Sequence, residues 1–199
     1  MILNRIFNFK KIALWNKIDN FNRKIIHVLS AVIIFFFPYV FSLNQIIFVS
    51  LLFVLIFSIA RFFNFLPIIN RVKRVSWGEV FYPLGIMLVA IFFLPDNIRA
   101  FQFGVLVLGF SDSLANIFGD LFGIHRIKLL GGAKSLEGSL VFLLSTFFLI
   151  FLFRSNVDFY NIDLYLIIAL ALTLVEFSLF FGLDNLILPS LAAYLFSLL

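Results

Sequence analysis

Seven apolar runs, most of them close to the length of one membrane-crossing helix, make up the greater part of this 199-residue chain. They lie at about Ile25–Phe41, Gln45–Phe63, Val80–Leu94, Ala100–Gly119, Leu140–Phe153, Leu164–Phe181 and Asn185–Leu199. A chain that crosses a bilayer must satisfy its backbone hydrogen bonds internally, and these runs lack the alternating pattern of membrane β-strands. The sequence therefore predicts an all-α fold, a polytopic integral membrane helical bundle with about seven transmembrane helices.

Composition supports a membrane location. Hydrophobic residues make up 63% of the chain and charged residues only 13%, whereas soluble domains are roughly 45–50% apolar. No polar block is long enough to form a separate soluble domain, so residues 25–199 are expected to form a single transmembrane domain. The absence of cysteine excludes thiol catalysis, disulfides and Cys-based zinc sites.

The distribution of positive charge predicts the orientation. All but two of the 15 Lys and Arg residues lie in the amino-terminal tail, in 61–74 and in 126–134. Because cytoplasmic loops are enriched in Lys and Arg, the amino terminus is expected in the cytoplasm and the carboxyl terminus outside. Residues 1–24 mix basic and large apolar side chains, which predicts an amphipathic segment on the cytoplasmic membrane surface. The alternative, a cleaved signal peptide, lacks a small-residue cleavage site.

A small, acidic stripe follows one side of the helix expected in the fourth run. Counted from Asp112 with a helical period, the residues on this face are Ala115, Asn116, Gly119, Asp120 and Gly123. An unpaired charge inside the bilayer costs at least about 2.5–3.5 kcal/mol, so Asp112 needs a partner or a cavity. Asp112 and Asp120, with Asn116 between them, offer the oxygen ligands that Mg²⁺ prefers. The alternative is an ion pair with a neighbouring helix, the glycines serving close packing.

A glycine-rich stretch with one lysine follows, Gly131-Gly132-Ala133-Lys134-Ser135-Leu136-Glu137-Gly138-Ser139. It predicts a flexible loop that leads into a helix, where backbone N–H groups and the Lys134 ammonium meet an anion such as phosphate. The alternative is a turn in which Ser135 caps the helix and Glu137 interacts with the helix dipole. An anion site one short loop from a cation site is what a metal-bound nucleoside triphosphate needs.

Basic residues at the start of the first run are expected at the same cytoplasmic rim. Arg23 and His27 share one helical face, with Lys24 beside them. These side chains can hold a phosphate, and His27 can help to deprotonate a hydroxyl group because histidine titrates near neutrality. The alternative is a set of basic residues that only reach the lipid headgroups.

Acidic residues open two further runs and interrupt a third. Glu79 opens the third run, and Asp184 and Asn185 open the seventh. Each of these three has a structural alternative, as a first-turn acid or a helix cap. Glu176 lies inside the sixth run, where a buried acid needs a partner.

In combination, these motifs resemble the polyprenol kinase family, which includes dolichol kinases, phytol kinases and CTP-dependent diacylglycerol kinases. The resemblance rests on Arg23-Lys24-x-x-His27, Gly78-Glu79 with Phe81-Tyr82-Pro83-Leu84-Gly85, Asp112-x-x-Ala115-x-x-x-Gly119-x-x-x-Gly123, Lys134-Ser135-x-Glu137-Gly138-Ser139, and Glu176 with Gly182-x-Asp184-Asn185-x-x-x-Pro189. It implies that residues 25–199 form a catalytic domain that transfers a phosphoryl group from CTP, with Mg²⁺, to the hydroxyl of a membrane lipid. It places Asp112, Lys134, Ser135, Glu137 and Gly138, and also Glu79, Asp184 and Asn185, at the nucleotide site.

Together with the polar groups described above, the resemblance defines an expected site at the cytoplasmic face. Residues expected in catalysis are Glu137, Lys134, His27 and Asp112. Residues expected to bind the nucleotide are Asn116, Gly119, Gly123, Lys134, Ser135, Gly138, Ser139, Arg23, Lys24, Asp184 and Asn185. Metal ligands are expected to be Asp112, Asp120 and Glu79. Glu176 is a further buried acid without an assigned role.

Other functions stay open at this stage. Phosphatidate cytidylyltransferases have a related Asp–Gly–Gly helix and Lys-Thr-x-Glu-Gly motif, but their carboxy-terminal signature is absent after Ser139. A small cation-coupled transporter would use Asp112 and Glu176 as ion sites, but it predicts an internal repeat, which the sequence lacks. A scaffold would leave the clustered acids and Lys134 unexplained. The expected partners are CTP and a membrane lipid alcohol, not nucleic acid; the acceptor and the oligomeric state are not indicated.

Overall fold

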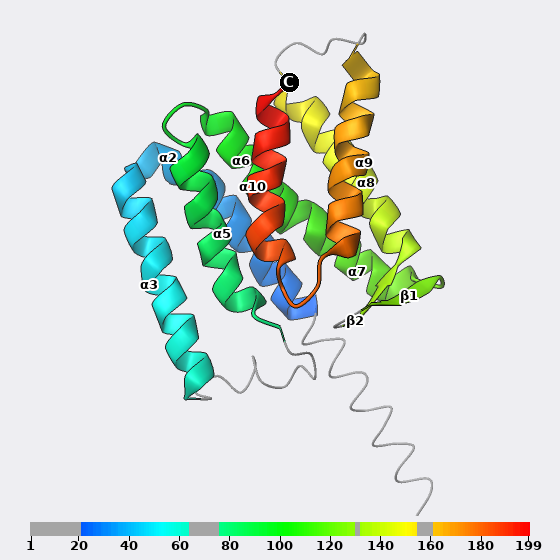
Figure 1. Ribbon diagram of the computed structural model, residues 1–199, viewed down its shortest axis with the longest axis horizontal. Coiled ribbons are helices and arrows are strands. Elements are labelled where there is room, and N and C mark those ends of the chain that lie inside the picture. Colours follow the sequence, from blue (N-terminus) through cyan, green and yellow to red (C-terminus); the bar gives the residue numbers. More distant parts are fainter. Residues whose placement is uncertain (1–20, 64–75, 130–131, 155–160) are drawn as a thin grey trace, which may run out of the picture.

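The computed structural model describes residues 21–63, 76–129, 132–154 and 161–199, and within them the chain is almost entirely helical (Figure 1). The first helix spans Phe21–Val40, and its last part is α2 (Phe37–Val40). The elements that follow are α3 (Leu43–Phe62), α5 (Gly78–Phe93), α6 (Ile98–Leu106), η1 (Val107–Ser111), α7 (Asp112–Phe122), β1 (Arg126–Leu129), β2 (Gly132–Ser135), α8 (Leu136–Phe153), α9 (Ile162–Ser178) and α10 (Asp184–Ser197). Most of the predicted amphipathic segment 1–24 and of the basic region 61–74 lies outside the described residues.

Every predicted apolar run contains a helix, so the prediction of an all-α, multi-helix fold is confirmed. Among the described residues, four helices are long and apolar enough to cross a membrane, namely Phe21–Val40, Leu43–Phe62, Ile98–Phe122 and Leu136–Phe153. The helices α5, α9 and α10 are shorter, with 16, 17 and 14 residues. Seven spans and a cytoplasmic amino terminus therefore stay predictions.

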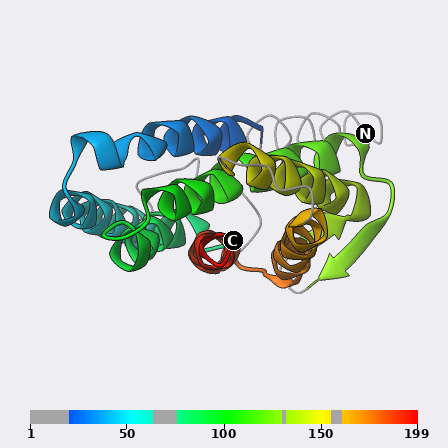
Figure 2. The same ribbon diagram turned by 90° about the horizontal axis from the view of Figure 1, so that it is seen from above.

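The fourth predicted helix is not a uniform α-helix. Between α6 and α7 the chain forms the π-helical segment η1, and the Asp112 N–H, at the start of α7, bonds to the Val107 carbonyl. Gly109 in η1 faces the first helix so closely that a Cβ atom there would collide with Ala31, and a Cβ atom at Gly104 in α6 would collide with the Pro189 carbonyl of α10. The α6–η1 segment is therefore sandwiched between the first helix and α10 (Figure 2).

A β-hairpin replaces the flexible loop that the sequence predicts before α8. Strands β1 and β2 are antiparallel, with Arg126 opposite Ser135 and Ile127 opposite Lys134. Main-chain hydrogen bonds between the strands hold Lys134 in a defined register, which a loop of small residues would not do. The expectation of a flexible loop was wrong for the strand residues, because pairing with 126–129 was not visible in the composition of 131–139 alone.

The turn from α9 to α10 packs on the start of α5 at the end of the bundle that carries the hairpin (Figure 1). Gly182 has a φ of 87°, and a Cβ atom there would collide with the Gly78 backbone. The Asn185 Nδ2 donates a hydrogen bond to the Gly78 carbonyl at 2.8 Å. The motif Gly182-x-Asp184-Asn185 is thus explained locally, since glycine permits the close approach and Asn185 holds it.

Candidate active site

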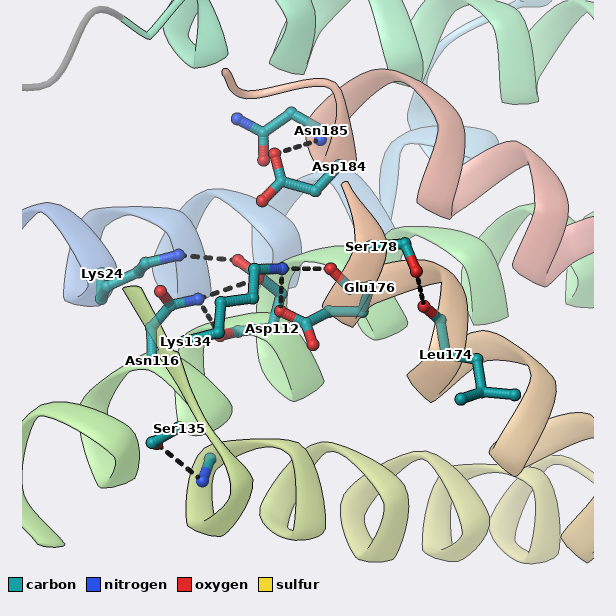
Figure 3. A network of polar contacts seen from close by, with 11 residues as sticks. Lys24, Asp112, Asn116, Lys134, Ser135, Leu174, Glu176, Ser178, Asp184 and Asn185 are labelled. Carbon is teal, nitrogen blue, oxygen red and sulfur yellow. Dashed lines mark hydrogen bonds and ion pairs between the residues drawn. The ribbon is translucent and has the colours of Figure 1, made fainter. Parts of the chain in front are cut away.

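Polar side chains from five elements meet at the hairpin end of the bundle. Lys24 comes from the first helix, Asp112 from α7, Lys134 from β2, Glu176 from α9 and Asp184 from α10. Figure 3 shows Lys24 and Lys134 extended toward the carboxylates of Asp112 and Glu176. We call these five residues the polar cluster. Their convergence on one end of the fold agrees with the sequence prediction.

Asp112 is the most deeply buried member of the polar cluster, with 0% exposure. Its Oδ2 forms an ion pair with the Lys24 Nζ at 2.7 Å, and its Oδ1 accepts a hydrogen bond from the Asn116 Nδ2 at 2.8 Å. Lys24 is itself only 6% exposed. The structure therefore shows the ion pair that the sequence left as the alternative to a metal, because a buried carboxylate needs a positive partner.

Lys134 is neutralised in a similar way by a residue that the sequence left without a role. Its Nζ lies 2.5 Å from the Glu176 Oε1 and also donates a hydrogen bond to the Glu176 carbonyl oxygen. Glu176 is 3% exposed and lies near the carboxyl end of α9, where the helix dipole favours a cation. Lys134 thus joins the hairpin to α9.

A pocket lies beside the polar cluster, between α7, the hairpin, the start of α8 and α9. Two lining residues, Ala115 and Arg126, were not predicted to belong to the site. The predicted ones are Asn116, Gly119, Asp120, Lys134, Ser135, Gly138, Ser139 and Glu176. The sequence motifs before and after the hairpin therefore do form one concave surface, which is the arrangement expected of a small-ligand site.

The small residues of the acidic stripe also pack helices α7 and α8 together. A Cβ atom at Gly119 would lie 2.7 Å from the Ser135 Oγ, and one at Gly138 would lie 2.6 Å from the Ala115 carbonyl oxygen. A Cβ atom at Gly123 would collide with the Gly119 carbonyl, and Gly123 does not line the pocket. Close helix packing, the structural alternative, is therefore one role of this stripe.

Two predicted site residues point elsewhere. Glu137 accepts a hydrogen bond from the His125 N–H at 3.1 Å and lies 2.8 Å from the His125 Nδ1, outside the pocket lining. Glu79 forms an ion pair with Arg61 of α3, whose guanidinium lies 4.3 Å from the centre of the Trp77 ring. In the described residues, no three acidic or histidine side chains are grouped to hold a metal ion. The three predicted metal ligands, Asp112, Asp120 and Glu79, are therefore not grouped together in this part of the chain.

His27 approaches the polar cluster from the first helix. Its ring packs against Tyr82 of α5 with 4.7 Å between ring centres, and the Tyr82 hydroxyl lies 2.8 Å from the Ser30 Oγ. The Nδ1 atom of His27 is buried and has no hydrogen-bond partner among the residues that the structure describes. His27 interacts electrostatically with Lys24 and Asp112, so it belongs to the same neighbourhood as the predicted site.

Comparison with known proteins shows to which family the chain belongs. No family model matches the chain, and no solved structure matches it significantly. It is 30% identical over 186 residues to an uncharacterised protein of Methanocaldococcus jannaschii, covering 87% of this chain and 90% of that protein. This chain belongs to the same family as that archaeal protein.

A second relative carries a functional name. The chain is 32% identical over 128 residues to a phytol kinase of Synechocystis, and the match covers 62% of this chain. The chain spans about half of that relative, since the match covers 55% of the phytol kinase. This similarity supports a polyprenol or phytol kinase-like family for the chain.

Sequence reasoning missed three contributions to this region. Arg126 lines the pocket, Glu176 neutralises Lys134, and Tyr82 packs on His27. Glu176 had a usable signal, because an acid in an apolar run requires a positive partner and Lys134 was available. Tyr82 belongs to the motif Phe81-Tyr82-Pro83-Leu84-Gly85, but the sequence indicated no role for its side chain. Arg126 was used only as evidence of orientation, because its place beside the pocket depends on the hairpin.

Proposed function

We propose that this chain is a CTP-dependent lipid kinase that phosphorylates the hydroxyl of a membrane isoprenoid alcohol, such as a polyprenol, dolichol or phytol. One observation supports this proposal most: Lys134 and Glu176 line a pocket at one end of a bundle of apolar helices, and Asn116 of the same lining donates a hydrogen bond to Asp112 of the buried Lys24–Asp112 pair. Such a site offers carboxylates for a metal cation and lysines for the phosphate groups of a nucleotide, close to the lipid-facing helices. The similarity to a phytol kinase supports the isoprenoid class of acceptor, and diacylglycerol is the alternative acceptor.

The residues present fit a magnesium ion. Mg²⁺ in phosphoryl-transfer sites takes one or two carboxylates and completes its shell with phosphate oxygens and water. The Asp112 carboxylate can serve as such a ligand, since it is buried, forms an ion pair with Lys24 and accepts a hydrogen bond from Asn116. When bound, Mg²⁺ would neutralise phosphate oxygens and align the transferred group. Lys24 would then release Asp112 and take a phosphate oxygen as its new partner.

The pocket residues have distinct roles in this proposal. Lys134 exchanges Glu176 for the phosphate that is transferred, and Gly138 and Ser139, in the first turns of α8, line the same pocket. The lipid oxygen attacks the terminal phosphorus, the bond from this phosphorus to the bridging oxygen breaks, and CDP leaves. The hydroxyl proton passes to a base. His27 suits that role better than Glu137, because its buried Nδ1 has no hydrogen-bond partner in the described part of the chain, whereas Glu137 binds His125.

The choice of CTP rests on the resemblance of the Asp112 and Lys134 motifs to the polyprenol kinase family. A transfer assay tests the proposal directly. The purified chain, in lipid, is incubated with Mg²⁺ and either CTP or ATP, and with a polyprenol, phytol, geranylgeraniol or diacylglycerol. Mass spectrometry should detect one phosphorylated alcohol, formed together with CDP. Absence of any phosphorylated lipid with either nucleotide would refute the proposal, and release of pyrophosphate with phosphatidate would indicate a cytidylyltransferase.

A further inference from the structure

Arg126 lines the pocket but belongs to none of the motifs that define the predicted site. It is the first residue of β1, directly opposite Ser135 in the hairpin. Its Nε donates a hydrogen bond to the Gly123 carbonyl at 3.1 Å, and its Nη2 donates to the carbonyls of Gly119 and Asp120 at 3.2 and 3.3 Å. The guanidinium is thus held in place at the carboxyl end of α7, where the helix dipole favours a cation.

The charge of Arg126 is balanced differently from that of the two lysines. Lys24 and Lys134 each form an ion pair with a carboxylate, Asp112 and Glu176. Arg126 forms no ion pair within the described residues, and its hydrogen bonds go to neutral main-chain carbonyls. An anion that enters the pocket must break an ion pair to reach either lysine. It meets no such competitor at Arg126.

The geometry of the guanidinium also suits an anion. Its Nε and Nη2 are the atoms that bind the carbonyls of α7, and Nη1 takes part in none of these bonds. The bonds fix the plane of the group on the pocket wall, so little side-chain entropy is lost when an anion binds. Ser139, in the first turns of α8, lines the same pocket as Arg126 and Lys134. A phosphate chain there would be contacted from the hairpin on one side and from α8 on the other.

We propose that Arg126 is a phosphate-binding residue of the nucleotide site and makes the first contact with the phosphate chain of a nucleoside triphosphate. This inference rests on the proposed function and adds to it a residue and an order of events. Arg126 captures the anion, after which Lys134 and Lys24 exchange their carboxylates for phosphate oxygens. Arg126 therefore acts mainly on nucleotide affinity, whereas Lys134 acts mainly on the rate of transfer.

Equilibrium binding tests the proposal without need of the lipid acceptor. The full chain in lipid nanodiscs is titrated with Mg²⁺ and CTP, and then with cytidine, for Arg126→Gln, Arg126→Lys and a control, Lys128→Gln. Lys128 is exposed, lies on the same strand and is outside the pocket lining, so its variant loses the same charge. We expect Arg126→Gln to weaken CTP binding roughly 10- to 100-fold, as for a lost charge-assisted hydrogen bond, and to leave cytidine binding unchanged. Lys128→Gln should bind CTP as the wild type does.

The outcomes separate this inference from the proposed function. If the wild type binds CTP and Arg126→Gln binds it equally well, the inference is overturned while the proposed function stands. If the wild type binds no nucleoside triphosphate, the proposed function fails and the inference with it. If thermal unfolding shows that Arg126→Gln is not folded, the CTP affinity of Arg126→Lys tests the inference instead. The lysine retains the charge at the end of α7 but not the planar fork, and unchanged CTP affinity in that variant would overturn the inference.

Discussion

The polar cluster and the Arg61–Glu79 pair both place an acidic side chain of one helix against a basic side chain of another element, yet they differ in surroundings. Asp112 and Glu176 are paired with Lys24 and Lys134; the Lys134–Glu176 pair lines the pocket, and so does Asn116, which donates a hydrogen bond to Asp112. Glu79 joins α5 to the neighbouring α3 through Arg61, and neither residue lines the pocket. An ion pair between two helices is thus no indicator of function by itself. What distinguishes the cluster is that five elements supply it and that two of its residues, Lys134 and Glu176, line a pocket.

The largest effect is expected for Asp112→Asn. Loss of this carboxylate removes the proposed metal ligand, so phosphoryl transfer should fall by at least roughly 1,000-fold. It also leaves Lys24 buried without its partner, which typically costs about 3–5 kcal/mol of stability. The double variant Asp112→Asn with Lys24→Gln removes both charges and should regain most of the stability but none of the activity. Transfer assays and thermal unfolding measure the two effects, and recovery of activity in the double variant would show that Asp112 is only structural.

Lys134→Met should have the next largest effect. We expect the rate of transfer to fall roughly 100-fold, because an ammonium that stabilises charge on the transferred phosphate is lost. Lys128→Met, on the paired strand outside the pocket, provides the control and should retain full activity. Steady-state kinetics with CTP separate the rate from the affinity. An unchanged rate in Lys134→Met would leave the Lys134–Glu176 pair with the same structural role as Arg61–Glu79.

Glu176→Gln tests whether Glu176 serves as a resting partner for Lys134. The variant should be destabilised by roughly 1–2 kcal/mol, because Lys134 is partly exposed and its unpaired charge is partly hydrated. Phosphate groups supply the missing negative charge, so Mg²⁺ and CTP should raise the melting temperature of the variant more than that of the wild type. A smaller ligand-induced rise than in the wild type would instead mean that Glu176 itself binds the metal–nucleotide complex.

Glu79→Gln should have the smallest effect, and it tests the Arg61–Glu79 pair in the same way as the variants above test the polar cluster. Its ion pair is partly exposed and neither partner lines the pocket, so we expect at most about 1 kcal/mol of lost stability and activity within roughly threefold of the wild type. Arg61→Gln provides the matched variant and should behave alike, because it breaks the same pair. A loss of activity in Glu79→Gln alone, close to that of Asp112→Asn, would restore Glu79 as a metal ligand and end the distinction between the two regions.

Much of the site was predictable because polar residues are costly in an apolar chain. Asp112, Lys134 and Asp184 stood out against their surroundings, and the positive-inside pattern placed them at one end of the helices before any packing was known. Local rules also held for Ser135, whose Oγ accepts the hydrogen bond from the Gly138 N–H that caps α8. Glu137 lies in the first turn of α8, where acids are favoured, but its carboxylate accepts a hydrogen bond from the His125 N–H. No sequence motif indicated this contact.

The sequence by itself determined the helices of this protein, its membrane-compatible composition and the end of the bundle at which its charges gather. Only the tertiary structure decided which charges pair. Lys24 and Asp112 are 88 residues apart, and Lys134 and Glu176 are 42 apart. Their pairing depends on how helices lined by interchangeable Phe, Leu and Ile residues pack, and the hairpin that carries Arg126 and Lys134 depends on strand register. Apolar periodicity specifies which face of a helix is buried, but it does not specify the neighbour against which that face is buried.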